Sequence, residues 1–275
     1  MSNILEKAIN LGFSGGVAKL SDIARLSVPS KNVFPTSIPM FDKAMDGGLR
    51  EGELITISGI SGQGKTTYTL NLAIRLSDLS VPSLYFSYEM DNYYLNQNFK
   101  KIRNEDMLVY SPLELTSGSL EFIEESIKDG VENQAIKVVF IDHLHFLISM
   151  KNSTNASLMI GGIVRELKKM AIKHKVIIFL IAHTRKINTG DVLGVSSIRD
   201  SGMIVAESDY VMMVSRKRKV EVRAMTDEID YGDGREFINV GRVEIIKNRR
   251  TGNMCYQDFT VENGRFVEKI KETEV

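Results

Sequence analysis

The sequence predicts an α/β fold in which a mainly parallel, twisted sheet carries helices on both faces. Three observations support this prediction. A phosphate-binding motif lies between an expected strand and an expected helix, strands and helices alternate after it, and two apolar runs are typical of strands buried on both faces. The two apolar runs span residues 137–141 and 176–181. No internal repeat and no low-complexity segment interrupts this pattern.

Residues 59–66 read Gly-Ile-Ser-Gly-Gln-Gly-Lys-Thr and fit the P-loop pattern G-x-x-x-x-G-K-[ST] at every fixed position. An alternating, β-branched segment precedes the motif and apolar residues at helical spacing follow it, which counts against a chance match. Glycines let backbone N–H groups close on phosphate oxygens, and the helix end adds partial positive charge. We therefore expect a bound nucleoside triphosphate, with Lys65 at its β- and γ-phosphates and the Thr66 hydroxyl on Mg²⁺. The expected contacts are Gly59, Ser61, Gly62, Gln63, Gly64, Lys65, Thr66 and Thr67.

The composition bounds the class of protein. The 275 residues suffice for one large domain or two small ones, and 43% apolar and 25% charged content is ordinary for a soluble globular protein. A net charge of zero excludes a global attraction to nucleic acid or membrane, so any basic site must be local. The single cysteine, Cys255, permits neither an internal disulfide nor a cysteine-based zinc site. With no long apolar run and no signal-peptide core, we expect a cytoplasmic protein with no membrane partner.

Two segments precede the P-loop. Residues 3–13 predict a short amphipathic helix that is too short to be stable alone, so it must dock on its own domain or on a neighbouring subunit. Residues 27–39 carry three prolines among serines and predict a linker. We therefore expect a linker region at residues 1–33 and a compact domain at residues 34–275.

After the P-loop the expected elements alternate. Besides the two apolar runs, strands are expected at residues 53–58, 83–88, 107–111, 210–214, 242–247, 256–261 and 265–268. Helices are expected at residues 91–103, from 120 to about 128, and around 160–171 between the two apolar runs. The closing strands have no long helix between them, which predicts an antiparallel extension of the sheet.

Three polar residues at strand ends are candidates for chemistry. Asp142 ends an apolar run, where P-loop enzymes place the carboxylate that supports Mg²⁺, although many other strands also end in Asp. Glu89 would face the γ-phosphate if its strand neighbours the P-loop strand; otherwise it is a surface glutamate at a helix start. His183 follows the second apolar run, where it is either a γ-phosphate sensor or a structural histidine.

Five sequence blocks, covering about residues 36–268, resemble the ATPase domain of DnaB-type replicative helicases and related phage helicase–primases, members of the RecA superfamily. The blocks are the P-loop; Ser-Tyr-Glu-Met at 87–90; Phe-Ile-Asp at 140–142; Ile-Arg-Asp-Ser-Gly at 198–202 with Ala-Glu-Ser-Asp at 206–209; and Ile-Ile-Lys-Asn-Arg at 245–249. The fourth block separates this family from other P-loop proteins better than the P-loop does. A RecA-like fold is implied.

The resemblance also implies roles for single residues. Glu89 would be the catalytic base, Asp142 the Mg²⁺-supporting carboxylate and His183 the γ-phosphate sensor, with histidine at that position favouring the phage relatives. Arg249, with Lys247 two residues earlier on the same strand face, would enter a neighbouring subunit's ATP site as an arginine finger. The adjacent arginine at position 250 leaves a one-residue shift open, and a basic solvated strand end is the alternative for the whole segment.

In this family two loops that line the channel of a ring hold the nucleic acid. The corresponding segments are residues 150–157, for which a polar surface loop is the alternative, and residues 184–202. The candidate DNA contacts are Lys151, Asn152, Arg185, Lys186, Arg199 and Gly202. The basic cluster at residues 216–219 has no assigned role.

The expected function is an ATP- and Mg²⁺-dependent replicative DNA helicase motor. By resemblance it would form a homo-hexameric ring and move 5′–3′ on single-stranded DNA, with a primase or a helicase loader as further partners. Two alternatives stay open: a RecA-superfamily recombinase or regulatory ATPase of the RadA or KaiC kind, and an accessory ATP-binding replication protein.

Overall fold

The computed structural model of this protein describes residues 32–90, 93–95, 97, 108–110, 120–147, 156–184, 198, 201–218 and 237–269. The predicted helix at residues 3–13 and most of the one at 91–103 lie outside these residues. One compact unit comprises Val33–Val275.

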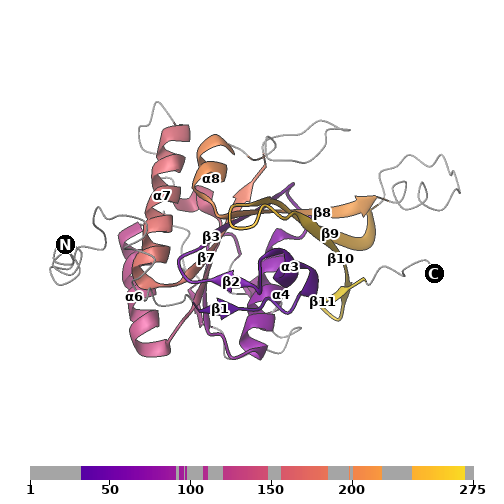
Figure 1. Ribbon diagram of the computed structural model, residues 1–275, viewed down its shortest axis with the longest axis horizontal. Helices are drawn as coiled ribbons and strands as arrows, with labels where there is room; N and C mark the ends of the chain where they lie inside the picture. Colours follow the sequence, from indigo (N-terminus) through magenta and orange to yellow (C-terminus); the bar gives the residue numbers. More distant parts are fainter. Residues whose placement is uncertain are drawn as a thin grey trace, which may run out of the picture. The chain divides into compact units, whose positions relative to one another are not determined.

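A nine-stranded sheet forms the centre of this unit (Figure 1), with the strand order β11-β10-β9-β8-β3-β7-β6-β4-β5. Its parallel part consists of β3 (Leu54–Gly59), β4 (Ser83–Ser87), β5 (Leu108–Tyr110), β6 (Val138–Asp142), β7 (Ile177–His183) and β8 (Tyr210–Arg218). The P-loop strand β3 lies between β7 and β8. The prediction of a mainly parallel sheet is confirmed, and all of its carboxyl ends meet at one edge.

The closing strands pair in antiparallel fashion, as predicted. They are β9 (Phe237–Asn248), β10 (Cys255–Glu262) and β11 (Arg265–Glu268). β9 pairs with β8, and β10 joins β9 to β11. The predicted strand at residues 242–247 is the part of β9 that alternates clearly, whereas the structure extends β9 over 12 residues.

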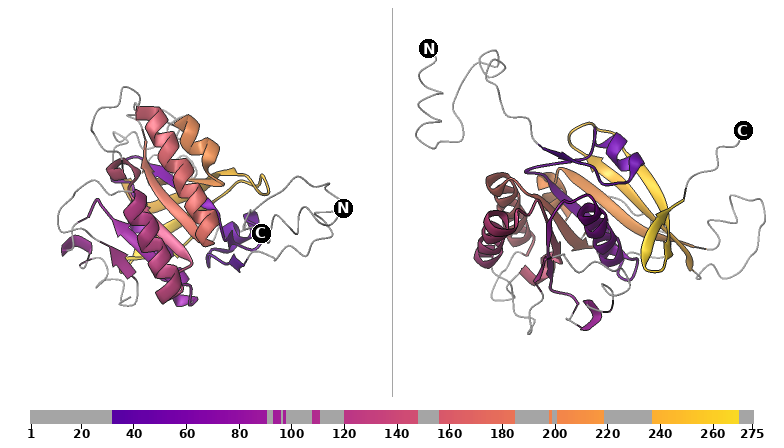
Figure 2. Two further views of the ribbon diagram at one scale, coloured as in Figure 1. Left: turned by 90° about the vertical axis from the view of Figure 1, so that its left-hand side faces the viewer. Right: turned by 90° about the horizontal axis from the view of Figure 1, so that it is seen from below.

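Helices cover both faces of the sheet. They are α3 (Pro39–Ala44), α4 (Lys65–Asp78), α6 (Leu120–Gln134), α7 (Ala156–His174) and α8 (Ser201–Glu207), with a short 3₁₀ helix at Leu144–Leu147. Figure 2 shows α6, α7 and α8 side by side on one face, with α4 on the other. The predicted helix near 160–171 is confirmed, and α6 continues past its expected end near residue 128.

Alternate residues of the central strands enter two separate cores. In β7, Ile177, Phe179 and Ile181 pack in the cluster that includes α4, while Ile178 and Leu180 pack in the cluster with α6 and α7. Because successive side chains of a strand point to opposite faces, a strand covered on both faces must be apolar throughout. This explains the continuous apolar runs in the sequence.

The compact unit starts with short elements that the sequence analysis did not predict. A two-stranded sheet of β1 (Val33–Phe34) and β2 (Leu49–Arg50) flanks α3, within and just after the expected linker. Two-residue strands carry no readable alternation, and α3 begins at a proline, which is favoured at the first helical position. One of the three prolines that suggested a linker, Pro39, therefore marks a helix start. None of the helices that the structure describes is long and apolar enough to cross a lipid bilayer.

Candidate nucleotide-binding site

The P-loop connects β3 to α4 at the carboxyl edge of the sheet. Gly59 ends β3 so close to β8 that a Cβ at this position would stand 2.2 Å from the carbonyl oxygen of Val214. Gly64 has a φ of 93° and immediately precedes Lys65, the first residue of α4. Both positions therefore require glycine for a backbone reason. The first N–H groups of α4 have no partners within the helix, as anion binding at a helix start requires.

Lys65 is buried and folded back onto the P-loop. Its Nζ donates hydrogen bonds to the carbonyl oxygens of Gly59 at 3.0 Å and Ile60 at 3.1 Å. Burial lowers the pKa of Lys65, and the charges of Glu89 and Asp142 act in the opposite direction. The two carboxylates favour the charged form of Lys65, and a desolvated ammonium group at the P-loop can attract a phosphate anion.

The other predicted phosphate contacts divide into two groups. Ser61, Gly62 and Thr67 are exposed. Gln63 is buried, and its side-chain oxygen accepts a hydrogen bond of 2.7 Å from the backbone N–H of Arg216 in β8. The side chain of Gln63 therefore joins the P-loop to the sheet, and its role at a phosphate would have to come from its backbone.

A pocket of about 330 Å³ opens beside the P-loop, between α4 and the antiparallel strands. Gln63, Thr67 and Arg242 contribute polar groups to it, and Val243, Phe259 and Phe266 contribute apolar surface. This mixture of apolar walls and a few polar groups suits a flat, partly polar molecule such as a nucleoside.

Asp142 ends β6 directly opposite the start of α4. Its Oδ2 accepts hydrogen bonds from the Thr66 hydroxyl at 2.8 Å and from the Tyr85 hydroxyl at 3.2 Å, while its Oδ1 is buried without a hydrogen-bond partner. Burial raises the pKa of Asp142 to about 6, and the charge of Glu89 adds to the rise. A buried carboxylate oxygen without a partner, beside a threonine hydroxyl, fits the needs of Mg²⁺, which prefers oxygen ligands. The residues present therefore fit this ion.

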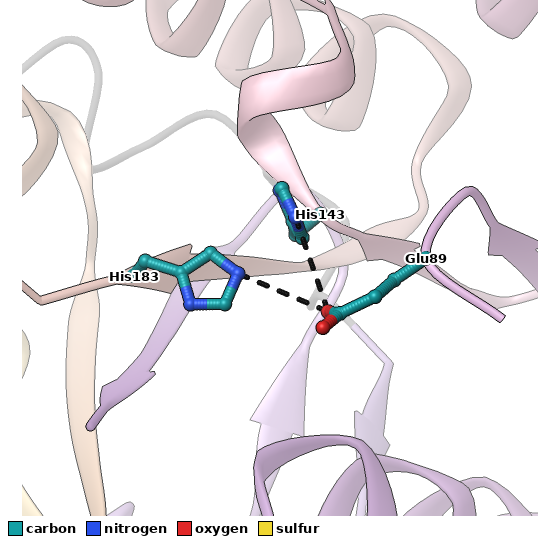
Figure 3. A group of neighbouring side chains, drawn as sticks. All are labelled: Glu89, His143 and His183. Carbon is teal, nitrogen blue, oxygen red and sulfur yellow. Dashed lines mark ion pairs between the residues drawn. The ribbon is translucent and has the colours of Figure 1, made fainter. Parts of the chain in front are cut away.

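Glu89 lies at the same edge of the sheet, but on a strand whose place in the sheet the sequence did not predict. The condition that its strand neighbours the P-loop strand is wrong, because β7 and β6 lie between β3 and β4. Glu89 follows β4 by two residues, and its Oε2 lies 3.8 Å from Nε2 of His183 at the end of β7 (Figure 3). The segment after β4 brings Glu89 close enough to affect the pKa of both Lys65 and Asp142.

His143 is the side chain at this edge that the sequence analysis missed. Its Nε2 lies 3.9 Å from Oε2 of Glu89, and its ring meets that of His183 edge-on with 4.3 Å between centroids (Figure 3). The available signal was its position directly after Asp142, a predicted metal ligand.

Lys247 and Arg249 converge on the end of α8. Lys247 donates to the carbonyl oxygens of Val205 and, at 2.7 Å, of Ser208, and burial lowers its pKa. Arg249 lies one residue past the end of β9, donates to the carbonyl oxygen of Ala206, and is 49% exposed. Cations near the carboxyl end of a helix are favoured by its dipole. Both side chains thus reach backbone carbonyls at the end of α8, although Arg249 lies beyond the strand that carries Lys247.

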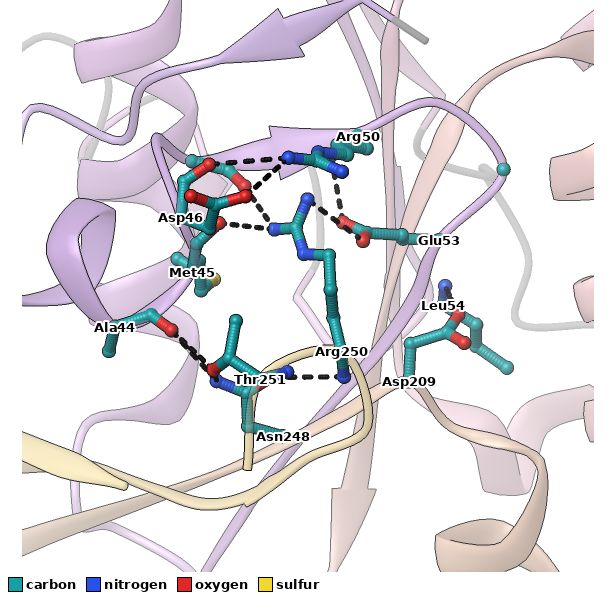
Figure 4. A network of polar contacts seen from close by, with 12 residues as sticks. Ala44, Met45, Asp46, Arg50, Glu53, Leu54, Asp209, Asn248, Arg250 and Thr251 are labelled. Carbon is teal, nitrogen blue, oxygen red and sulfur yellow. Dashed lines mark hydrogen bonds and ion pairs between the residues drawn. The ribbon is translucent and has the colours of Figure 1, made fainter. Parts of the chain in front are cut away.

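The side chain of Arg250 extends toward Met45 and Glu53 (Figure 4). Its Nη2 donates to the carbonyl oxygens of Met45 at 2.5 Å and Gly48 at 2.6 Å, and its Nη1 lies 3.7 Å from Oε1 of Glu53. These hydrogen bonds connect the turn after β9 to the segment after α3. Arg250 is the less exposed of the two arginines, at 18% against 49%, although Arg249 also contacts its own chain through Ala206 and through an ion pair of 3.5 Å with Asp209.

Strand register places this turn at the other edge of the sheet from the P-loop. Tyr210 of β8 pairs with Ile55 near the start of β3 and with Asn248 at the end of β9. Gly59 and the P-loop lie four residues further along β3, about 13 Å away at roughly 3.3 Å per residue. Arg249 and Lys65 of the same chain are therefore on opposite edges.

The predicted DNA contacts can be placed only in part. Gly202 is exposed near the start of α8, whereas Lys151, Asn152, Arg185, Lys186 and Arg199 lie outside the described residues. Thr184 forms an antiparallel bridge with Ile198, so the segment between them leaves and returns directly beside His183. In the basic cluster at 216–219, Lys217 forms an ion pair of 2.6 Å with Asp258 and therefore has a structural contact.

Ser208 and Asp209 of the fourth sequence block contact the start of β3 and α7. The buried Ser208 hydroxyl bonds with the Thr56 hydroxyl at 2.7 Å, and Oδ2 of Asp209 accepts from the backbone N–H of Leu54 at 2.8 Å and from Lys168 at 2.5 Å. Part of the block that resembles the helicase family thus anchors α8 to the start of β3.

The sequence pattern of the AAA domain family matches residues 21–189. The chain is 32% identical over 157 residues to a probable plasmid replicative DNA helicase of Chlamydia psittaci, covering 53% of this chain and 32% of that protein. It is 26% identical over 235 residues to the replicative DNA helicase DnaB of Haemophilus influenzae (74% and 48% covered) and 26% over 182 residues to the DNA repair protein RadA of Pseudomonas aeruginosa (64% and 37%). The chain thus spans less than half the length of these relatives.

Two solved structures share the fold. A DnaB-like replicative helicase, studied with its interactions with primase, superposes with a TM-score of 0.72 at 18% identity, covering 96% of this chain and 71% of that one. An ATPase domain solved on its own gives 0.70 at 18% identity, covering 98% and 99%. The RecA-like fold and the resemblance to DnaB-type ATPase domains inferred from the sequence are confirmed.

Proposed function

The chain belongs to the AAA domain family, and from that premise we propose that it is the ATP-hydrolysing motor of a replicative DNA helicase. The observation that carries the proposal is the convergence of Lys65, Thr66, Asp142 and Glu89 at the carboxyl ends of β3, β6 and β4. A buried ammonium group, a threonine hydroxyl and two carboxylates at the mouth of a P-loop are the groups that a Mg²⁺-bound triphosphate and an attacking water require.

In this proposal different residues of the chain bind the phosphates, hold Mg²⁺ and activate water. The N–H groups of the P-loop and the Lys65 ammonium bind the phosphates, and Thr66 and Asp142 hold Mg²⁺. Bound Mg²⁺ would neutralise charge on the phosphate oxygens. Glu89 orients a water molecule and accepts its proton. His183 lies within 3.8 Å of Glu89 and would sense whether the γ-phosphate is present. The pocket beside the P-loop would hold the nucleoside.

Arg249 would act in a neighbouring copy of the chain. It is half exposed and lies at the opposite edge of the sheet from its own P-loop, so it cannot complete its own site without unfolding the turn. A ring of copies with a head-to-tail arrangement would bring the amino edge of one sheet to the carboxyl edge of the next. Lys247, which contacts neighbouring carbonyls at the end of α8, would move with it. Residues 1–33 would help to hold such a ring, a hexamer in DnaB-type helicases, by docking on the adjacent subunit.

Coupling to single-stranded DNA would run through the segment bounded by the Thr184–Ile198 bridge. This segment begins one residue after the proposed sensor, so a movement of His183 would be transmitted to it directly. The direction of movement would be 5′–3′, and the primase named for a similar helicase structure is a candidate partner, as is a helicase loader. The proposed DNA contacts within and after the segment are Arg185, Lys186, Arg199 and Gly202, with Lys151 and Asn152 from the loop before α7.

A second candidate is a RadA-like ATPase, because RadA proteins are among the relatives at comparable identity. An accessory ATP-binding protein with little turnover is the non-enzymatic alternative. Strand-pairing activity without unwinding of a forked duplex would favour the RadA-like function.

The proposal is tested by measuring ATP hydrolysis across protein concentrations, with and without single-stranded DNA. We expect turnover per chain to rise with both, because the site needs a second copy and responds to the strand. Lys65→Ala should abolish turnover, while Lys169→Ala, an exposed lysine on α7 paired with Glu166, should not change it. Turnover that ignores DNA and concentration would contradict the motor and favour a self-contained switch.

A further inference from the structure

Glu89, His143 and His183 form a cluster at the carboxyl edge of the sheet whose arrangement goes beyond ATP hydrolysis (Figure 3). The three residues follow or end β4, β6 and β7, which are adjacent strands in the sheet. Both imidazole rings direct Nε2 toward the same carboxylate oxygen, at 3.9 Å for His143 and 3.8 Å for His183. One ligand atom from each residue lies within 4.8 Å of the other two.

Two imidazoles and a carboxylate are a ligand set for a transition metal. Zn²⁺ binds histidine nitrogen and glutamate oxygen at about 2.0–2.2 Å, commonly with three protein ligands and one water molecule. Mg²⁺ prefers oxygen atoms and keeps several waters, so the same cluster disfavours it. The cluster is therefore distinct in its chemistry from the Thr66–Asp142 pair, which offers only oxygen.

Metal binding requires the three ligand atoms to move closer together. Ligand atoms around a tetrahedral Zn²⁺ stand about 3.3 Å apart, given bonds of about 2.0–2.1 Å. The two N···O separations of 3.9 and 3.8 Å would have to close by about half an ångström, and the two histidine nitrogens, which lie within 4.8 Å of each other, would also have to approach, so rotations of both the glutamate and the imidazole side chains are needed. The carboxylate is 41% exposed and the histidines 12% and 23%, so an ion can enter and a water molecule can occupy the fourth position.

We propose that Glu89, His143 and His183 bind Zn²⁺, or a similar transition-metal ion, and that the bound ion stops ATP hydrolysis. The binding step rests on the cluster alone. The inhibition rests on the proposed function, because a Glu89 carboxylate that ligates a metal no longer accepts a proton from water. The site would thus make turnover sensitive to free transition metal while leaving the Mg²⁺ ligands untouched.

The test is a Zn²⁺ titration of the full chain without nucleotide, followed by calorimetry, with Co²⁺ absorption as a second probe of coordination. The wild type should bind one ion, and His143→Asn and Glu89→Gln should weaken binding by more than the roughly 10–100-fold that loss of a merely supporting partner costs. The matched control is His174→Asn. His174 also lies beside a glutamate, 3.3 Å from Oε1 of Glu124, but no second imidazole faces that pair among the described side chains.

Two further measurements distinguish metal binding at the cluster from its effect on ATP hydrolysis. In a Zn²⁺-soaked crystal of the wild type, an anomalous peak should lie between the three ligand atoms, which requires no variant to fold. Turnover with Mg²⁺ should fall on addition of Zn²⁺ in the wild type and in His174→Asn, and should resist it in His143→Asn. Binding that is unchanged in His143→Asn, or a peak elsewhere, would overturn the inference. Tight binding at this cluster without any effect on turnover would leave the metal site standing and contradict the role of Glu89 as the base.

Discussion

Two polar regions at opposite edges of the sheet differ in what their side chains contact. At the amino edge, Asn248 and Arg250 use their side chains on backbone groups of the same chain (Figure 4). The Asn248 amide donates to the carbonyl oxygens of Ala44 at 3.0 Å and Asn253 at 2.9 Å, and its oxygen accepts from the N–H groups that follow it. At the carboxyl edge, Asp142 has a buried oxygen without a partner and a raised pKa. Nε and Nη1 of Arg250 are also buried without a hydrogen-bond partner, so the two regions differ in kind: the amino-edge side chains connect segments of their own chain, whereas the carboxyl edge presents a carboxylate oxygen that can bind a cation.

The adjacent residues Arg249 and Arg250 show the same difference within one turn. Arg250 is 18% exposed and faces the carboxylate of Glu53, which is 9% exposed. Arg249 is 49% exposed and lies 3.5 Å from the carboxylate of Asp209, which also pairs with Lys168. A buried ion pair is costly to break, and an exposed one contributes little to stability. Changes at the carboxyl edge and at Arg249 should therefore reduce turnover, while changes in the Arg250 contacts should reduce stability.

The largest effect is expected for Arg249→Ala. Loss of an arginine finger should slow ATP hydrolysis by ~10³–10⁵-fold while nucleotide binding and the unfolding midpoint stay close to the wild type. Steady-state turnover and denaturant unfolding measure the two quantities. The control is Arg165→Ala, an exposed arginine on α7 that pairs with Glu207 at 2.9 Å. Equal loss of stability and turnover in Arg249→Ala would place Arg249 with the structural residues.

Glu89→Gln should reduce turnover by ~10²–10⁴-fold, because the amide cannot accept the proton of water. Binding of a fluorescent ATP analogue should persist. Glu166→Gln, which changes an exposed carboxylate on α7, should leave both quantities unaltered. If Glu89→Gln retains full hydrolysis, the base is another residue and the proposed site is wrong.

Arg250→Ala should destabilise the protein by about 3–5 kcal/mol, because the carbonyl oxygens of Met45 and Gly48 lose a donor and a buried ion pair with Glu53 is broken. The midpoint of urea unfolding should fall, while turnover per folded chain should stay near that of the wild type. A large loss of turnover with unchanged stability would instead show that Arg250 is the finger and that the two arginines have been interchanged.

Asp142→Asn should change stability and activity in opposite directions, and its effect on stability should depend on pH. The pKa of Asp142 is raised to about 6, so the folded state holds this proton more tightly than the unfolded chain does. Stability therefore falls as pH rises from about 4 to 6, by up to about 3 kcal/mol, and stays reduced above pH 6. Asp142→Asn should raise the melting temperature at pH 7.5, lose this advantage near pH 4, and abolish Mg²⁺-dependent turnover. An unchanged or lower melting temperature of Asp142→Asn at pH 7.5 would contradict the conclusion that burying the charged Asp142 carboxylate costs stability.

Gln63→Ala should have the smallest effect. It removes one hydrogen bond between the P-loop and the backbone of Arg216, which costs about 1 kcal/mol. Thermal unfolding should show a small decrease, and Ser61→Ala, at an exposed position of the same loop, should show none. A loss of several kcal/mol would mean that this contact organises the whole loop.

The sequence predicted the sheet well because its signals are local. A strand buried on both faces must be a run of apolar residues, and the P-loop glycines are forced by backbone contacts such as that of Gly59 with Val214. The order of the strands is not local. It depends on which crossovers pack best, so the separation of β4 from β3 could not be read from the residues around Glu89.

The different surroundings of Arg249 and Arg250 were also beyond the sequence. Both are arginines at a strand end, and only the turn after Asn248 determines which one points inward. His143 was missed for a similar reason, since its neighbours Glu89 and His183 come from distant parts of the chain. Spatial clusters drawn from three strands leave no fixed spacing in a sequence.

The central claim is that each ATP site takes Glu89 from one chain and Arg249 from another. The most direct measurement is hydrolysis by an equal mixture of Glu89→Gln and Arg249→Ala chains, combined before they assemble. Each variant alone should be nearly inactive. The mixture should recover roughly a quarter of wild-type turnover, because a quarter of randomly formed interfaces pair an intact Glu89 with an intact Arg249. A mixture no more active than its two components would contradict a site shared between chains.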